Sequence, residues 1–281
     1  MNRFCIITNR GKDEGLVFTD GLVSYIRKKG GSCKVLDGSL GADGAYTDPA
    51  GIPEDVQCAI VLGGDGTIIR AATDLADRAV PIFGINLGTL GFLAETEKQD
   101  AFRAIDLLFE DEIRIEERMM LDSEIYFEEQ KLFEGRALND VVVTRSGYSR
   151  LICAEVYVNG ELLNEYRGDG VIVATPTGST GYNLSAGGPI VMPGAKLMLV
   201  TPICPHSINN REIAISAEDE VTILVKESKK TLEEEAFATL DGKDAIRLKT
   251  GERIVIRRSD RTAKLVRRKD RSFFDILRTK L

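Results

Sequence analysis

An apolar run that ends in a glycine-rich turn with one acid is the strongest chemical feature of the sequence. Residues 58–67 read Cys-Ala-Ile-Val-Leu-Gly-Gly-Asp-Gly-Thr, and the apolar part is typical of a strand covered on both faces in a parallel sheet. Gly63, Gly64 and Gly66 have no side chains, so backbone N–H groups can approach a bound anion. A helix expected from residue 68 would point its positive N-terminal end at the same place. The pattern predicts a phosphate site.

The turn also carries an acid, Asp65, where an anion is expected to bind. A carboxylate beside phosphates is unfavourable unless it holds a metal ion or takes a proton from a reacting hydroxyl, which favours phosphoryl transfer to an alcohol. The turn lacks the Gly-Lys-Ser/Thr end of a Walker loop and the G-x-G-x-x-G spacing of a dinucleotide fingerprint. The alternative is a strand-turn-helix corner in which the acid is only tolerated.

A segment rich in glycine and hydroxyl residues is the second feature. Residues 167–189 read Arg-Gly-Asp-Gly-Val-Ile-Val-Ala-Thr-Pro-Thr-Gly-Ser-Thr-Gly-Tyr-Asn-Leu-Ser-Ala-Gly-Gly-Pro. Small hydrogen-bonding groups and an approachable backbone suit a sugar, a phosphate or a base, and Tyr182 adds a flat ring. A polar pair, Asn139-Asp140, interrupts another apolar run at 137–142.

The N-terminal part of the chain alternates strands and helices. Strands separated by helices predict a parallel doubly wound sheet, whose ligands lie at the carboxyl ends of the strands. The segment 37–55 is rich in glycine, proline and acids and predicts a mobile surface loop. The expected strands are 4–8, 33–36, 59–62 and 81–85, and the expected helices are 15–29, 68–76 and 99–110.

After residue 113 the pattern changes to short alternating strands, with hairpin signals at Asn159-Gly160 and Asp241-Gly242. We expect an α/β + β protein, with an N-terminal doubly wound α/β domain (1–112) and a C-terminal all-β sandwich-like domain (113–252). The basic tail, 253–281, predicts strand edges with a solvated face or a surface that attracts phosphates. The strands expected in the second part are 119–127, 132–144, 151–158, 171–174, 221–225 and 236–240.

The composition favours a soluble enzyme of two domains. The chain has 281 residues and a net charge of -7, which argues against nonspecific nucleic-acid binding. No stretch approaches the roughly 18 apolar residues of a membrane span, and residues 1–7 show no signal-peptide pattern, so we expect a cytoplasmic location. The five scattered cysteines form no C-x-x-C pair and predict buried thiols without a metal site.

Taken together, the motifs at 63–67, 139–140 and 167–189 resemble those of the bacterial NAD kinase family. That family carries GGDGT, an Asn-acid pair and a GDG…TPTGST.Y…SAGGP segment, and the resemblance covers nearly the whole chain. It implies transfer of the ATP γ-phosphate to the 2′-hydroxyl of the adenosine ribose of NAD. It also implies Mg2+ or another divalent cation with ATP, a homodimer or homotetramer, and a tail that returns to the first domain.

The resemblance also implies roles for single residues. Asp65 matches the general base, and Gly66 and Arg70 match positions that hold phosphates and dinucleotide, in the same turn as Gly63 and Gly64. Asn139 and Asp140 match the Asn-acid pair, although the usual acid is the longer Glu, and Lys243 stands where the family often has Gln. Further implied ligand positions are Arg150, Arg167, Asp169, Thr180, Gly181 (usually Ala), Tyr182 as the adenine-stacking ring, Asn183, Leu184, Ser185 and His206, the only histidine, which could instead be structural.

Two rival functions share part of these features. A lipid kinase of the diacylglycerol or sphingosine type also has a Gly-Gly-Asp-Gly turn and a β-rich second domain, but it lacks the TPTGST…SAGGP segment. A dinucleotide sensor without catalysis would keep that segment and lose Asp65, which is present here. The partners that we expect are therefore NAD and ATP, with no nucleic acid and no membrane.

Overall fold

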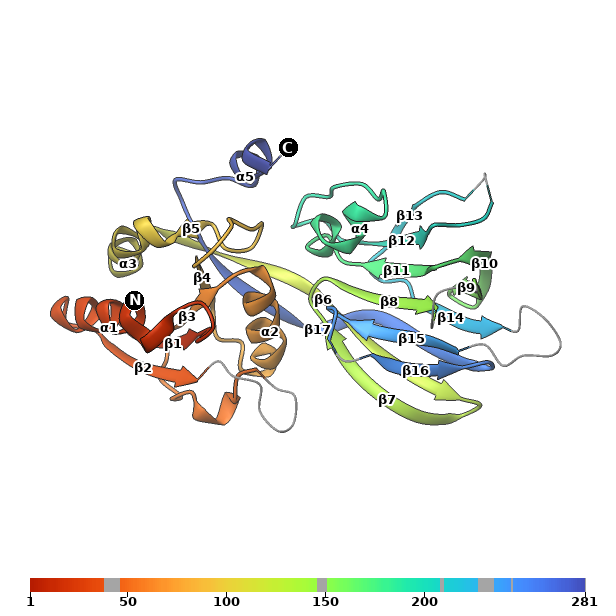
Figure 1. The fold of residues 1–281 in the computed structure, drawn as a ribbon, viewed down its shortest axis with the longest axis horizontal. Helices are drawn as coiled ribbons and strands as arrows, with labels where there is room; N and C mark the ends of the chain where they lie inside the picture. Colours follow the sequence, from red (N-terminus) through yellow and green to blue (C-terminus); the bar gives the residue numbers. More distant parts are fainter. Residues whose placement is uncertain (38–45, 146–150, 208–209, 227–234, 244, 281) are drawn as a thin grey trace. The chain divides into compact units, whose positions relative to one another are not determined.

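The computed structural model describes the chain except residues 38–45, 146–150, 208–209, 227–234, 244 and 281. The chain forms two compact units, one of residues 1–118 and 262–281 and the other of residues 119–261 (Figure 1). The C-terminal residues therefore belong to the same unit as the N-terminus. The sequence-based domain boundaries after residues 112 and 252 stay predictions, while the compact units change at 118/119 and 261/262.

The first unit is built on a parallel sheet in the order β4-β3-β1-β2, and β17 pairs parallel to β4. Every residue of β3 is buried, which explains its unbroken apolar sequence. The elements of this unit are β1 (Arg3–Thr8), α1 (Val17–Lys28), β2 (Ser32–Asp37), β3 (Cys58–Gly63), α2 (Asp65–Asp74), β4 (Ile82–Asn86), β5 (Thr96–Glu97), α3 (Ala101–Phe109), α5 (Phe273–Lys280) and the short 3-10 turns Glu14–Leu16, Pro49–Gly51, Ala76–Arg78 and Lys98–Asp100.

Helices cover both faces of this sheet. On one face, Ile6 and Ile60 share a buried cluster with Ile26 of α1 and Leu108 of α3. On the other face α2 packs so closely that a Cβ at Gly84 of β4 would overlap the side chain of Ile68. The doubly wound arrangement that the sequence predicts is thus confirmed.

The second unit is a sandwich of antiparallel strands. One sheet has the order β13-β12-β11-β8-β15-β16, and the other strands of the unit include β10-β9-β14-β17 and the β6-β7 pair. Both groups of strands bury side chains in one apolar cluster, so the sandwich-like class is confirmed. The strands are β6 (Ile113–Phe127), β7 (Gln130–Ala137), β8 (Asp140–Arg145), β9 (Ile152–Val158), β10 (Glu161–Gly168), β11 (Gly170–Ala174), β12 (Leu197–Ile203), β13 (Ile213–Ser216), β14 (Val221–Lys226), β15 (Glu235–Leu240), β16 (Ile246–Lys249) and β17 (Glu252–Arg268), with a short helix α4 (Tyr182–Ser185) after a 3-10 turn at Gly178–Thr180.

Several sequence-based elements were wrong. The single strand expected at 132–144 is two strands, because Leu138 and Asn139 leave the sheet between β7 and β8. Strands β10, β12, β13 and β16 were missed, and the helix expected from residue 68 begins at Asp65. Of the cysteines expected to be buried, Cys33 is half-buried and Cys204 is exposed.

The hairpin signals were read correctly. Asn159-Gly160 has φ values of 51° and 81°, as the two-residue turn between Val158 and Glu161 requires. Asp241-Gly242 also has a left-handed backbone, with φ values of 53° and 65°, but it begins a longer connection between Leu240 and Ile246. These turns join β9 to β10 and β15 to β16.

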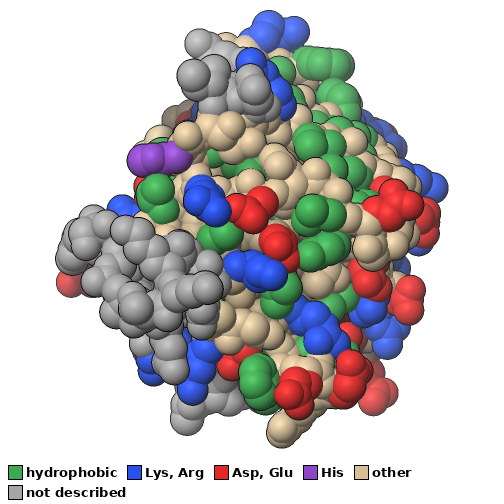
Figure 2. All heavy atoms as spheres, turned by 90° about the vertical axis from the view of Figure 1, so that its right-hand side faces the viewer, with side chains coloured by type: hydrophobic (Ala, Val, Ile, Leu, Met, Phe, Trp, Pro, Cys, Tyr) green, Lys and Arg blue, Asp and Glu red, His purple; other side chains and the backbone are tan. Residues whose placement is uncertain are grey.

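The surface of the second unit carries charges of both signs. On the face drawn in Figure 2, Lys, Arg, Asp and Glu side chains are interspersed with apolar ones. Within the described part of the chain, no helix has the length and apolar character needed to span a membrane.

Candidate active site

The glycine turn is the first turn of helix α2. Gly64 is the N-cap in an extended conformation, and its carbonyl accepts hydrogen bonds from Thr67 N (3.0 Å) and Ile68 N (3.2 Å). Asp65 and Gly66 therefore occupy the start of the N-terminal turn, where backbone N–H groups have no carbonyl partner within the helix. Such a turn attracts anions because the helix dipole is positive there.

The carboxylate of Asp65 is held by the backbone that follows β4. Its Oδ2 accepts from Phe92 N at 2.7 Å, and its Oδ1 accepts from Leu93 N at 3.1 Å and Ala94 N at 3.2 Å. A Cβ at Gly91 would overlap this carboxylate, so only glycine allows the loop to approach so closely. Gly88, earlier in the same connection, lies near Lys12 instead, so Gly91 is the glycine that fits around Asp65.

The three donors leave part of the carboxylate available. An ionised carboxylate offers about four lone-pair sites, and three of them are used here. Oδ1 accepts two of these bonds and Oδ2 accepts one. Within the described part of the chain, the site that these donors leave unused is on Oδ2, and the three hydrogen bonds fix the orientation of the side chain.

Asp65 lies in the wall of a cavity of about 660 Å3 in the first unit. Of the predicted residues, Gly64, Asp65, Gly66 and Arg70 line it. Gly63 has a different role, because a Cβ there would overlap the side chain of Thr67 and push α2 away from β3. The other lining residues, which the sequence analysis did not select, are Asn9, Lys12, Tyr46, Thr67, Thr89, Leu90, Gly91 and Lys280.

Among the described residues, three cations line the same cavity as the acid. Lys12 follows β1, and its Nζ lies 3.1 Å from the position of a Cβ at Gly64. Arg70 is one helical turn further along α2, with its guanidinium 6.0 Å from the ring centre of Tyr46. Lys280 comes from α5. Together with the helix N-terminus, these cations make the cavity suitable for a polyphosphate. The position of Lys12 just after a strand, beside other carboxyl strand ends, was the available sequence signal.

In the second unit, Asn139 and Asp140 form a turn held by Asp241. Asp241 accepts from Leu138 N (2.7 Å), Asn139 N (2.7 Å) and Asp140 N (3.2 Å). Thr175 binds the same turn, because its Oγ1 donates to Leu138 O at 2.7 Å and its N–H donates to Asn139 O at 2.8 Å. The sequence analysis used Asp241 only as a hairpin signal and missed this support.

Asp140 is a buried acid with a strongly perturbed pKa. Burial, and then the charge of Asp241, raise the pKa of Asp140 from 3.8 to about 7. Burial also raises the pKa of Asp241, although its three backbone N–H bonds act in the opposite direction. Asn139 adds a buried amide oxygen that has no hydrogen-bond partner among the residues that the structure describes. Unsatisfied polar groups of this kind are typical of a binding site.

The glycine- and hydroxyl-rich segment packs directly on this turn. A Cβ at Gly178 would overlap Asn139 O, and a Cβ at Gly181 would lie 3.3 Å from Asn139 Nδ2 and 3.7 Å from Asp140 Oδ2. The ring of Tyr182 is 44% exposed, so one face is available for stacking. The structure thus brings Asn139, Asp140 and Gly181 together, with Tyr182 next along the chain.

Asn183 points into the fold. It is fully buried, its Nδ2 donates to Ser179 O and Pro189 O (both 3.1 Å), and its Oδ1 accepts from Thr201 Oγ1 at 2.7 Å. Its side chain therefore shapes the segment around it. The neighbouring predicted residues are half-buried Thr180 and Leu184 and exposed Ser185.

The other predicted residues lie around β10, β11 and β12. Asp169 is half-buried and accepts from Arg145 Nε at 2.6 Å. Burial raises the pKa of Tyr182, and the charges of Cys204, Asp169 and Asp140 raise it further. Exposed Arg167 pairs with Glu165 at 2.9 Å, and its carbonyl accepts from the N–H of exposed His206 at 2.8 Å. Lys243 is half-buried beside Asp241, whereas Arg150 lies outside the described residues.

Across the described ranges, no group of three or more His, Cys, Asp or Glu residues is placed to hold a metal ion. Among the described residues that line the first-unit cavity, Asp65 is the one with a carboxylate.

Comparisons with known proteins identify the family. Two family models match, the ATP-NAD kinase N-terminal domain over residues 7–113 and the ATP-NAD kinase C-terminal domain over residues 138–268. An NAD kinase of Lachnoclostridium phytofermentans is 52% identical over 282 residues, which cover 100% of this chain and 99% of that protein.

Solved structures give the same result. An NAD kinase from Archaeoglobus fulgidus in complex with ATP has a TM-score of 0.76 and 25% identity, covering 99% of this chain and 98% of that chain. Yeast NADH kinase complexed with NADH is alike in fold, with a TM-score of 0.81, 21% identity, and 96% and 84% coverage. The resemblance read from the motifs is confirmed, and the chain belongs to the ATP-NAD kinase family of phosphotransferases.

Proposed function

We propose that the chain transfers the γ-phosphate of ATP to the 2′-hydroxyl of the adenosine ribose of NAD, with Asp65 as the general base. The observation that carries this proposal is the free lone-pair site on Oδ2 of a carboxylate held by three N–H donors inside a cationic cavity. Oδ2 takes the hydroxyl proton as the new O–P bond forms, while the bond between the γ-phosphorus and the β,γ-bridging oxygen breaks and ADP leaves. The fixed orientation of the carboxylate reduces the entropy that the reaction has to overcome.

The cavity of the first unit supplies the groups that hold phosphates. The N–H groups at Asp65 and Gly66 and the cations Lys12 and Arg70 complement the negative charge of a nucleotide. Mg2+ fits this set as an ion carried by the nucleotide, because such ions usually bind phosphates, water and one or two carboxylates. When bound, the ion would neutralise charge on the transferred phosphoryl group.

The second unit supplies the groups proposed to bind the dinucleotide. Asn139 and Asp140 offer an amide and a carboxyl group on a rigid turn, and Tyr182 offers an exposed ring. Asn183 acts by shaping the segment. The remaining proposed contacts are Arg150, Arg167, Asp169, Thr180, Gly181, Leu184, Ser185 and His206.

The acceptor is tested by incubating the purified protein with ATP and Mg2+ and with NAD, diacylglycerol or sphingosine. We expect NADP to form and both lipids to remain unmodified. Phosphorylation of a lipid without NADP formation would contradict the proposal in favour of a lipid kinase. Binding of NAD without turnover would favour a sensor.

The base is tested with Asp65→Asn. Loss of general-base help should lower kcat by roughly 10² to 10⁴, with little change in the KM for NAD. If Asp65 mainly holds the metal, excess Mg2+ should restore part of the rate. A kcat within about threefold of the parent would contradict the general-base role.

We also propose a cytoplasmic homodimer or homotetramer. Exposed strand edges of the β-rich unit favour pairing between copies. Light scattering at micromolar concentration tests the assembly, and a monomer would contradict it.

A further inference from the structure

The loop of residues 90–95, whose N–H groups donate to Asp65, is itself bound by the C-terminal segment of the chain. Three cations from residues 262–281 donate to backbone carbonyls of the 90–95 loop: Arg267 Nη1 to Leu93 O at 2.7 Å, Arg271 Nη1 to Glu95 O at 3.3 Å, and Lys280 Nζ to Leu90 O. The loop therefore uses its N–H groups toward Asp65 and its carbonyls toward these cations. We call Arg267, Arg271 and Lys280 the carbonyl clamp.

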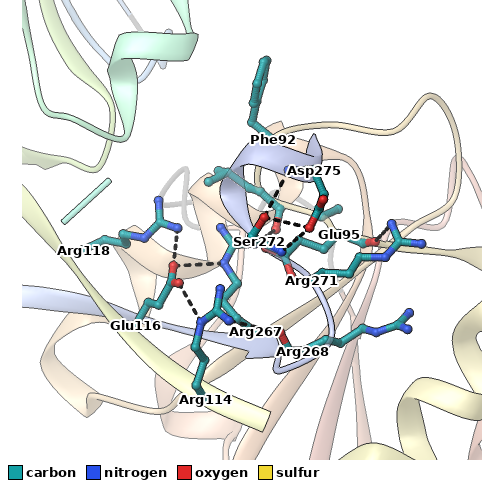
Figure 3. Close-up of polar contacts among 12 residues, drawn as sticks. Phe92, Glu95, Arg114, Glu116, Arg118, Arg267, Arg268, Arg271, Ser272 and Asp275 are labelled. Atoms are coloured by element: carbon teal, nitrogen blue, oxygen red, sulfur yellow. Dashed lines mark hydrogen bonds and ion pairs between the residues drawn. The ribbon is translucent and has the colours of Figure 1, made fainter. Parts of the chain in front are cut away.

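Arg267 is the most constrained member of the clamp. Its side chain is only 3% exposed, and its Nη1 lies 3.1 Å from Oε1 of buried Glu95. Its Nε lies 3.4 Å from Oε2 of Glu116, which also binds Arg118 at 2.7 Å and Arg114 at 3.0 Å (Figure 3). The guanidinium thus lies within ion-pair distance of two carboxylates, and its hydrogen bond to Leu93 O joins this cluster to the loop.

Such a buried ionic cluster needs an explanation beyond stability. Buried ion pairs are often replaceable by apolar residues without loss of stability, because desolvation offsets their attraction. Burial raises the pKa of Glu95 despite the attraction of Arg267, which indicates that the desolvation is substantial. Orienting a nearby group is a use that an apolar cluster could not supply.

Leu93 connects the cluster to the reacting group. Its carbonyl accepts from Arg267, and its N–H donates to Asp65 Oδ1 at 3.1 Å. The adjacent N–H groups of Phe92 and Ala94 donate the other two hydrogen bonds to the carboxylate. A shift of Leu93 would therefore move the Asp65 carboxylate.

We propose that Arg267 is a positioning residue for the phosphoryl transfer, which fixes Leu93 and thereby the orientation of the Asp65 carboxylate. This inference rests on the proposed role of Asp65 as general base. The clamp links the C-terminal segment of the chain to the catalytic turn near its N-terminus.

The test compares Arg267→Lys with Arg268→Lys. Lysine keeps the charge but cannot reach the loop and both carboxylates with one ammonium group. Arg268 is the matched control, since it is the next residue, is also buried, and pairs with Asp270 at 2.6 Å. We expect Arg267→Lys to lower kcat by roughly tenfold with the KM for NAD and ATP nearly unchanged. Arg268→Lys should leave kcat within about twofold.

Two further readouts separate positioning from a general structural role. Amide hydrogen exchange at Phe92, Leu93 and Ala94 should speed up in Arg267→Lys and stay unchanged in Arg268→Lys. In the Asp65→Asn background, Arg267→Lys should cause no further fall in kcat, since the group that it positions is gone. If Arg267→Lys does not fold, Arg271→Gln tests the same clamp at a less buried position, with an expected loss of about threefold.

The outcomes distinguish the two proposals. If Asp65→Asn keeps kcat, the general base fails and the positioning role fails with it. If Asp65→Asn is impaired while Arg267→Lys, or Arg271→Gln in its place, behaves as Arg268→Lys does, only the positioning role is wrong. An equal loss from Arg267→Lys in both backgrounds would also overturn it.

Discussion

Asp241 binds the backbone N–H of Asp140 at 3.2 Å while its charge opposes ionisation of the Asp140 side chain. One acid therefore fixes the backbone of another and at the same time disfavours its charge. The pair places a carboxyl group that titrates near neutrality on the turn proposed to bind the dinucleotide.

Asp140→Asn should stabilise the protein at high pH. The pKa of Asp140 rises from 3.8 to about 7 on folding, so its stabilising contribution is complete below about pH 4 and is lost as the pH rises through 7. Asparagine does not titrate, so its advantage over the parent should grow from pH 4 to 7 and then level off, at no more than about 4 kcal/mol. Denaturant unfolding of both proteins across this range measures it. An advantage that does not change with pH would contradict the assignment.

Asp241→Ala should destabilise the second unit and weaken NAD binding. The change leaves three backbone N–H groups of the 138–140 turn without their acceptor, at about 1 to 3 kcal/mol for each group that stays buried. Asp219→Ala is the control, because Asp219 also accepts two hydrogen bonds but at an exposed turn. We expect a lower Tm and a higher KM for NAD in Asp241→Ala only.

Gly91→Ala should abolish most activity. The added Cβ would overlap the Asp65 carboxylate and force the loop or α2 to shift. We expect kcat to fall by roughly 10² or more, because a displacement of about 1 Å is enough for such a loss. Gly194→Ala is the control, since a Cβ there has open space around it. Similar kcat values for the two variants would mean that the position of Asp65 is not critical.

Lys12→Gln should act on nucleotide binding more than on turnover. Lys12 lines the cavity and borders Gly64, so loss of its charge should raise the KM for ATP by roughly tenfold, as expected for one charge-assisted contact. The effect should shrink as ionic strength rises. Lys196→Gln, at an exposed position of the second unit, is the control. Equal KM values for the two variants would exclude Lys12 from the phosphate site.

The sequence by itself determined the fold class, the family and the central acid. These follow from local patterns, because unbroken apolar runs specify buried parallel strands and Asn-Gly and Asp-Gly specify hairpin turns. Asp65, Gly64, Gly66 and Arg70 lie within one short motif, so their proximity follows from the chain itself.

Only the tertiary structure decided which distant residues support that motif. Lys12 reaches Gly64, the N–H groups of residues 92–94 reach Asp65, and Arg267 reaches the 90–95 loop, each from a separate segment. Asp241 reaches the 138–140 turn from about one hundred residues away. Sequence periodicity does not reveal such contacts, because the type of a side chain does not show which group the backbone N–H of the same residue will bind. Asn183 shows the opposite case. It lies in a motif that predicts ligand binding, but its hydrogen bonds with Ser179 and Thr201 show that its side chain supports the interior.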